Sequence, residues 1–116
     1  MIIREVKLLS GVKLGETRHT AATIREETLD DELAVLEEGA GDMQLKHRRI
    51  MMRRVIRLGE LDKPNPALLR KLTRVDWDLI ETAMVAMDEE LEAEAKALSG
   101  STGGRSEPGG GAPGDV

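Results

Sequence analysis

The segment TIREETLDDELAVLE, residues 23–37, contains a change in the spacing of apolar residues from the period of a strand to that of a helix. On its strand side, residues 17–25 and 2–9 contain β-branched residues in partial alternation. The intervening SGVKLGE contains two glycines suited to a turn, Gly11 and Gly15. We therefore expect an N-terminal β-hairpin, in which alternation places these residues in pairs on one face of each strand: Val6 with Leu8, and Ala22 with Ile24.

On the helical side of the segment, Thr28 and Asp31 resemble a capping box in which Asp replaces the usual Glu. Three leucines then follow at helical spacing, Leu29, Leu33 and Leu36. This pattern predicts a helix over residues 29–38, and two glycines just beyond it, Gly39 and Gly41, would end it.

Three further helices are indicated by capping residues. Asp42 can cap a helix over 43–58 that Gly59 ends, and Asn65 with Pro66 begins a short one that reaches about Leu72. Thr73 and Asp76 repeat the capping pattern at the start of a helix over 74–98. The predicted fold is α+β: an N-terminal β-hairpin followed by a small bundle of three to four helices, as one domain over 1–98, with a disordered Gly/Ser/Pro-rich tail over 99–116.

The segment KHRRIMMRRVIRL, residues 46–58, contains six Lys or Arg and no acid, although the chain has a net charge of -5. Residues 26–42 contain eight acids and no base, and residues 75–98 contain eight acids and one Lys. These flanking acids favour pairing of the basic helix within the chain. An acidic surface of a partner protein and nucleic acid remain as alternatives, and the second of these would make the protein a small DNA-binding regulator using the basic helix 46–57.

The residues that usually carry catalysis or bind metal are sparse. The chain has no Cys, and His19 and His47 have no Ser, Cys or His at meaningful spacing. The acids after Asp88 form a run typical of a solvated helix face rather than a catalytic pair. We expect no enzymatic activity, cofactor or metal, and because no apolar run approaches about 18 residues, we expect a soluble protein without membrane association.

Methionines on the predicted apolar helix faces have two interpretations. Met fills irregular cores, but Met-rich surfaces also adapt to apolar segments of partner proteins. Trp77 and Ile80 are expected to anchor the last helix to the domain, because the acidic run further along cannot be buried. Apolar residues beside that run are therefore candidates for partner binding, together with two methionines of the basic helix; the full candidate set is Met84, Met87, Leu91, Met51 and Met52.

Two phrases of the sequence lie at entries into the predicted helices. The first, R-E-x-T-x-x-D, consists of Arg25, Glu26, Thr28 and Asp31. The second phrase, L-x-x-L-T-x-x-D-W, consists of Leu69, Leu72, Thr73, Asp76 and Trp77. With these phrases, about residues 3–92 resemble the tail assembly chaperone family of Mu-like phages and prophages, which often has Pro at the position of Glu27.

This resemblance implies a non-enzymatic protein of the host bacterial cytoplasm that is absent from the mature virion. Its implied partner is the tape measure protein, which it would keep soluble until tail tube subunits polymerise around it. The tube subunits, or a frameshifted longer form of the chain, are further implied partners, and the Gly109–Gly111 run is compatible with a slippery stretch of G nucleotides. A structural tail or head-completion component is a third interpretation.

Overall fold

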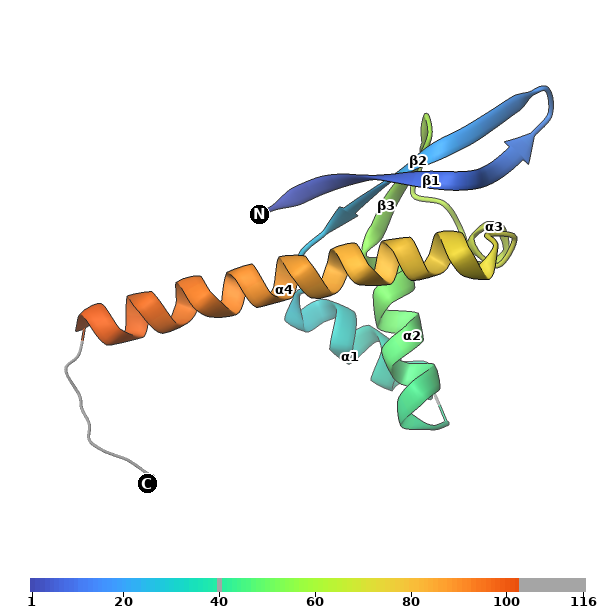
Figure 1. Ribbon diagram of the computed structural model, residues 1–116. Coiled ribbons are helices and arrows are strands. Elements are labelled where there is room, and N and C mark those ends of the chain that lie inside the picture. The colour runs from blue at the N-terminus through green and yellow to red at the C-terminus, as the bar shows by residue number, and fades with distance from the viewer. Residues whose placement is uncertain (40, 103–116) are drawn as a thin grey trace. The chain divides into compact units, whose positions relative to one another are not determined.

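The computed structural model describes residues 1–39 and 41–102 of the chain. These form an antiparallel sheet and four helices, which confirms the predicted α+β class with its N-terminal hairpin (Figure 1). The strands are β1 (Ile3–Leu14), β2 (Thr17–Arg25), β3 (Val55–Leu58) and β4 (Leu61–Asp62), in the sheet order β1-β2-β3-β4. The helices are α1 (Leu29–Glu37), α2 (Met43–Arg53), α3 (Pro66–Leu69) and α4 (Arg74–Thr102).

The β1–β2 hairpin is longer than the sequence pattern indicates. Strand β1 continues through most of the expected turn, and only Gly15, in the left-handed region at a φ of 61°, and Glu16 separate it from β2. The pairing register shifts between Lys7 and Val12. Gly11 lies in this irregularity at a φ of 69°, and a Cβ there would clash with the carbonyl oxygen of His19. Both expected inward pairs, listed above for the two strands, are buried.

The prediction of a helix over 43–58 was wrong in its last third. Helix α2 ends at Arg53, and Val55–Leu58 forms strand β3, which pairs Val55 with Ile24 and Leu58 with Ala22. The β-branched pair Val55 and Ile56 suits a strand, and pairing with β2 satisfies its backbone groups. A turn at Gly59, with a φ of 61°, then leads to β4.

The other helices differ from expectation mainly at their ends. Helix α3 ends at Leu69 rather than near Leu72, and α4 continues to Thr102, four residues past the expected end. In α1 the three leucines that mark the helical period are exposed, and the helix instead buries Asp31 and Val35. The rest of the predicted disordered tail, and with it the Gly109–Gly111 run, lies outside the described residues.

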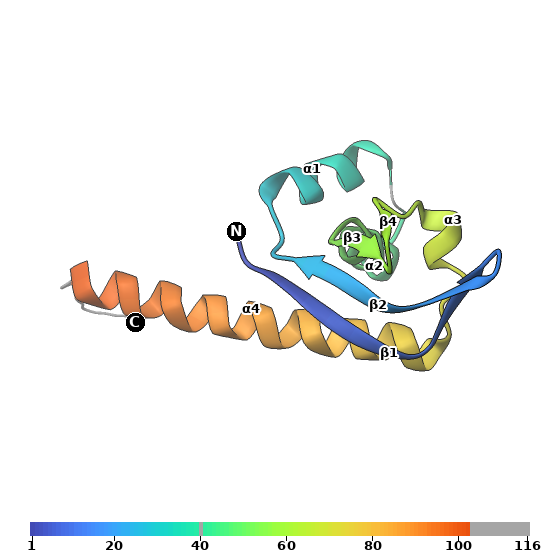
Figure 2. The same ribbon diagram turned by 90° about the horizontal axis from the view of Figure 1, so that it is seen from above.

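The chain forms two compact units, and the boundary between them lies within α4, after Val85. The first contains the whole sheet, α1, α2, α3 and the start of α4, which runs beside β1 (Figure 2). Asp76, in this part of α4, accepts hydrogen bonds from backbone N–H groups of β1. The core of this unit is apolar, and both the sheet and the four helices contribute to it. Its buried residues are Val6, Leu8, Val12, Ala22, Ile24, Val35, Ile50, Met51, Val55, Leu58, Leu68, Leu69, Trp77, Ile80 and Met84. The second unit begins at Ala86 and contains the remainder of α4. In the described ranges, no helix has both the length and the apolar content needed to cross a bilayer.

Candidate functional site

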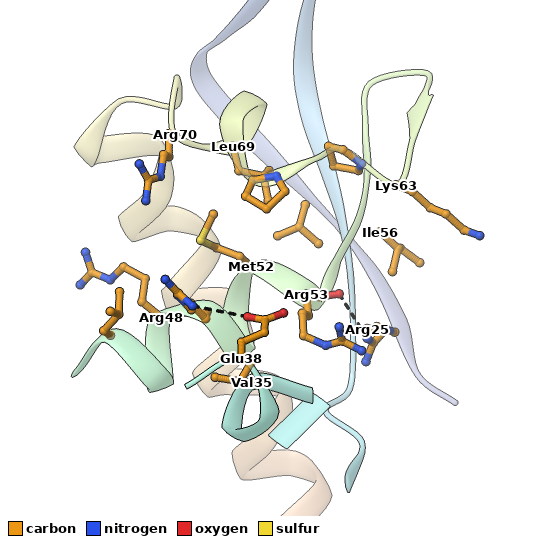
Figure 3. A pocket seen from close by; sticks show the side chains of 15 residues that line it. Arg25, Val35, Glu38, Arg48, Met52, Arg53, Ile56, Lys63, Leu69 and Arg70 are labelled. Carbon is orange, nitrogen blue, oxygen red and sulfur yellow. Dashed lines mark hydrogen bonds and ion pairs between the residues drawn. The ribbon is translucent and has the colours of Figure 1, made fainter. Parts of the chain in front are cut away.

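An open groove of about 790 Å³ lies in the first unit, between the α1–α2 pair and the segment that runs from β3 to α3 (Figure 3). Its lining residues are Arg25, Val35, Glu38, Leu45, Arg48, Arg49, Met52, Arg53, Val55, Ile56, Lys63, Pro64, Pro66, Leu69 and Arg70. A smaller hollow of about 310 Å³ shares four of these residues and extends the groove to Trp77 at the start of α4. A concave surface of this size is adequate for the side chains of one face of a helix.

The floor of the groove is apolar, and two features of the chain build it. Strand β3 brings Val55 and Ile56 beside β2, which a continuous helix to residue 58 would not do. The short helix α3 brings Leu69, because the side chain of Asn65 accepts a hydrogen bond from the Leu68 backbone N–H at 2.8 Å and Pro66 occupies the first turn. Met52 from α2 is partly exposed and lies next to Leu69 in Figure 3.

The rim of the groove is strongly basic. The lining contains six cationic side chains, Arg25, Arg48, Arg49, Arg53, Lys63 and Arg70, and a single acid, Glu38. Glu38 is 3.5 Å from Arg49, and the Arg48 guanidinium is 4.0 Å from Glu81, at the limit of an ion pair. Within the described ranges no ion pair involves Arg70 or Lys63. Arg48, Lys63 and Arg70 are exposed, so this part of the rim offers positive charge to a ligand.

A buried carboxylate holds one end of this rim in place. Both Asp31 oxygens accept hydrogen bonds at 2.7 Å from the two Nη atoms of Arg25, and Arg53 Nε donates to the same carboxylate at 3.0 Å. The Thr28 backbone N–H adds a bond of 2.8 Å, which completes the capping box predicted from the sequence. Burial alone would raise the pKa of Asp31, but the hydrogen bonds from Arg25, Thr28 and Arg53 outweigh it and hold that pKa well below its usual range.

The cations of residues 46–58 are used in several ways. Arg49 pairs with Glu38 just after α1, Arg53 pairs with Asp30 of α1, and Arg57 pairs with Asp62 at 3.3 Å across the β3–β4 turn. Arg54 is buried and its Nε donates to the Arg25 carbonyl at 3.0 Å. Arg48 retains an exposed side chain beside the groove. The basic segment is therefore partly paired within the chain and partly available at the rim.

The five candidate partner residues from the sequence have different environments. Met84 and Met87 have no exposed surface, and Met51 is also buried, so the expectation that these three are accessible was wrong. Met51 and Met84 fill the apolar core of the first unit, the use that Met side chains serve most often. Leu91 and Met52 are partly exposed, and of the five only Met52 lines the groove.

Sequence reasoning missed the residues that complete the groove opposite Met52. Leu69 was assigned only to a short helix and to the second family phrase, Arg70 was given no role, and Ile56 was placed on a helix rather than a strand. The closely spaced prolines at 64 and 66 were a usable signal, because they break the chain into two short elements that converge on one hollow. Among the described residues, no group of three or more His, Cys, Asp or Glu side chains is arranged to hold a metal ion.

No protein-family model, curated protein or solved structure matches this chain.

Proposed function

We propose that the protein is a phage tail assembly chaperone. In this proposal it binds the tape measure protein in the cytoplasm of the host bacterium and keeps it soluble until tail tube subunits assemble around it, without becoming part of the virion. The two motif phrases, which include Thr28 with Asp31 and Thr73 with Asp76, support the family, and both are helix entries in the structure. The groove supports the binding role.

The single observation that carries the binding role is the combination of an apolar floor and a basic rim in one open groove. Apolar side chains from one helix face can enter such a groove, while acids beside them meet the surrounding arginines. The lining contains Arg, Lys, Glu and apolar residues, and no Ser, Thr, Cys, His or Asp. This composition suits binding rather than catalysis, and we assign the protein no enzymatic activity.

The chemistry of the floor suits a client that must be released. Met52 is unbranched and polarizable, so it can pack against different side chains at similar energy. The exposed rim cations, Arg48, Lys63 and Arg70, lie in solvent, where their attraction for acids is screened by salt. Binding through such contacts is reversible, as required of a chaperone whose client is later enclosed by the tail tube.

The test is coexpression with helical segments of the tape measure protein, whose gene is expected close to the gene for this chain. Met52→Asp places a charge on the floor of the groove and should abolish co-purification of the segment. Met43→Asp is the matched control, because Met43 is on the same helix, is exposed and lies outside the groove. Equal binding by the two variants would contradict the assignment of the groove.

The alternative of a DNA-binding regulator makes an opposite prediction. Its affinity for random duplex would fall by about tenfold to a thousandfold between roughly 50 and 200 mM salt, as expected for several phosphate contacts. We expect only weak nonspecific binding, because α2 ends at Arg53 and two of its cations pair with acids in or just after α1. Submicromolar binding with that salt dependence, in a mobility-shift assay, would favour the regulator.

A further inference from the structure

The second unit contains a segment whose chemistry is complementary to the groove. Residues 88–98, DEELEAEAKAL, contain five acids and one Lys within the helical α4. Leu91, Ala95 and Leu98 are spaced by four and three residues, so they form one narrow apolar stripe on the helix. Glu92 and Glu94 are exposed beside this stripe. The segment is thus an amphipathic helix with an apolar stripe bordered by carboxylates.

We propose that the groove of one copy of the chain binds the 88–98 helix of a second copy. The apolar stripe would lie on the floor formed by Met52, Ile56 and Leu69, and the carboxylates would lie along the rim. This placement matches charge as well as polarity, since three exposed cations, Arg48, Lys63 and Arg70, line the groove, whereas the segment has five acids and one cation.

Arg70 is one of two rim cations that would gain an acidic partner from this arrangement. It is exposed at the end of α3, and within the described residues no acid pairs with it. Lys63, which immediately precedes Pro64, is also exposed and is not paired with an acid in the described residues. A bound acidic helix would supply both cations with partners without breaking any ion pair seen in the first unit.

Self-association would therefore regulate the access of the client to the groove, and this consequence rests on the proposed function. Because the second copy would occupy the surface assigned to the tape measure protein, self-association and client binding exclude one another. At high chain concentration without client, the apolar floor is covered. When client is present, it competes for the groove by mass action.

The experiment is sedimentation velocity on the full chain over about a hundredfold range of concentration at low salt, where association should appear as a concentration-dependent increase in mass. Arg70→Glu and Glu92→Lys should each weaken association by about tenfold or more. The double variant carrying both changes should recover association, because the reversed charges again face each other. Lys13→Glu and Glu16→Lys are matched controls on the hairpin, outside the groove, and should behave as wild type.

Three results would overturn the proposal: a wild-type chain that stays monomeric throughout, single variants that associate like wild type, or a double variant that does not recover. If the 88–98 helix contacts the groove at every dilution while the chain stays monomeric, the contact lies within one chain, and this result would also overturn the proposal. The proposed function is tested separately by the Met52→Asp coexpression. Client binding without self-association would remove only this inference, and self-association without client binding would remove only the proposed function.

Discussion

Asp31 and Asp76 occupy the same place in the same motif, Thr-x-x-Asp at the start of a helix, and both side chains have no exposed surface. Their charges are compensated in different ways. Asp31 accepts hydrogen bonds from two arginine side chains. Asp76 accepts them from three successive backbone N–H groups of β1: Leu9 at 2.6 Å, Ser10 at 3.2 and 3.3 Å, and Gly11 at 2.8 Å.

The difference shows that the same Thr-x-x-Asp motif can have two different roles in the tertiary structure. Around Gly11 the register of β1 against β2 shifts, and Asp76 supplies acceptors for the N–H groups in that irregular stretch. It thereby joins β1 to α4 across more than sixty positions of sequence. Asp31 instead fixes Arg25 and Arg53, which line the groove. We infer that Asp76 maintains the scaffold and that Asp31 couples the scaffold to the binding surface.

The largest effect is expected for Asp76→Ala. Three backbone donors would lose a charged acceptor, at about 1.5–3 kcal/mol for each such bond, so the free energy of unfolding should fall by roughly 4 kcal/mol or more. Chemical denaturation followed through the single Trp measures this. Asp78→Ala on the same helix is the control, since Asp78 is exposed and should cost less than about 0.5 kcal/mol. A loss below about 1 kcal/mol for Asp76→Ala would remove the scaffold role.

A smaller loss, about 3 kcal/mol, is expected for Asp31→Ala. Removing one partner of a buried ion pair typically costs about 3–5 kcal/mol. The lower end applies because Arg25 and Arg53 are partly exposed and water can solvate them once Asp31 is gone. Asp30→Ala removes the exposed neighbour that also contacts Arg53 and should change stability by less than about 0.5 kcal/mol. Equal losses for the two variants would contradict the distinction between buried and exposed partners.

The contribution of Asp31 to the free energy of unfolding should depend on pH. Its pKa is lowered on folding from an unfolded value of about 3.9, so the folded state binds fewer protons. The stabilisation is therefore present above about pH 4 and is lost as the pH falls below that value. Denaturation at a series of pH values should show the gap between wild type and Asp31→Asn narrowing below about pH 4. A gap that stays constant down to about pH 2 would refute this assignment.

The smallest effect is expected for Arg49→Ala. Its guanidinium is 3.5 Å from Glu38, and both side chains are exposed by more than a third. A pair of this kind contributes about 0–1 kcal/mol, so stability should be almost unchanged in the same denaturation assay. A loss comparable to that of Asp31→Ala would show that the groove rim is part of the folding scaffold rather than a free surface.

The structural features that were predicted correctly from the sequence depend on residues that are close together in the chain. The cap at Thr28, the cap at Asn65 and the inward face of the hairpin are each determined by neighbours in the chain, and all three are present. It did not predict the partners of Asp76, because β1 is far from α4 in sequence. Nor did it predict strand β3, since Val55–Leu58 follows the predicted helix directly, with Gly59 as the first stop signal, and only pairing with β2 makes it a strand.

The groove could be predicted only in part for the same reason. Met52 was identified as a methionine on a predicted apolar helix face, but the adjacent candidate on the same face, Met51, is buried. Periodicity identifies an apolar face without showing what covers it. Leu69 and Arg70 join Met52 only because α3 and β3 converge in three dimensions.

The most direct test of the central claim, that the groove binds the tape measure protein, is site-specific photocrosslinking. The chain has no Cys, so Met52→Cys and Met43→Cys each provide one attachment point for a photoreactive label on the same helix. In a complex purified with a tape measure segment, we predict crosslinks from residue 52 and none from residue 43. Crosslinks from residue 43 alone, or from neither position in an intact complex, would contradict the account.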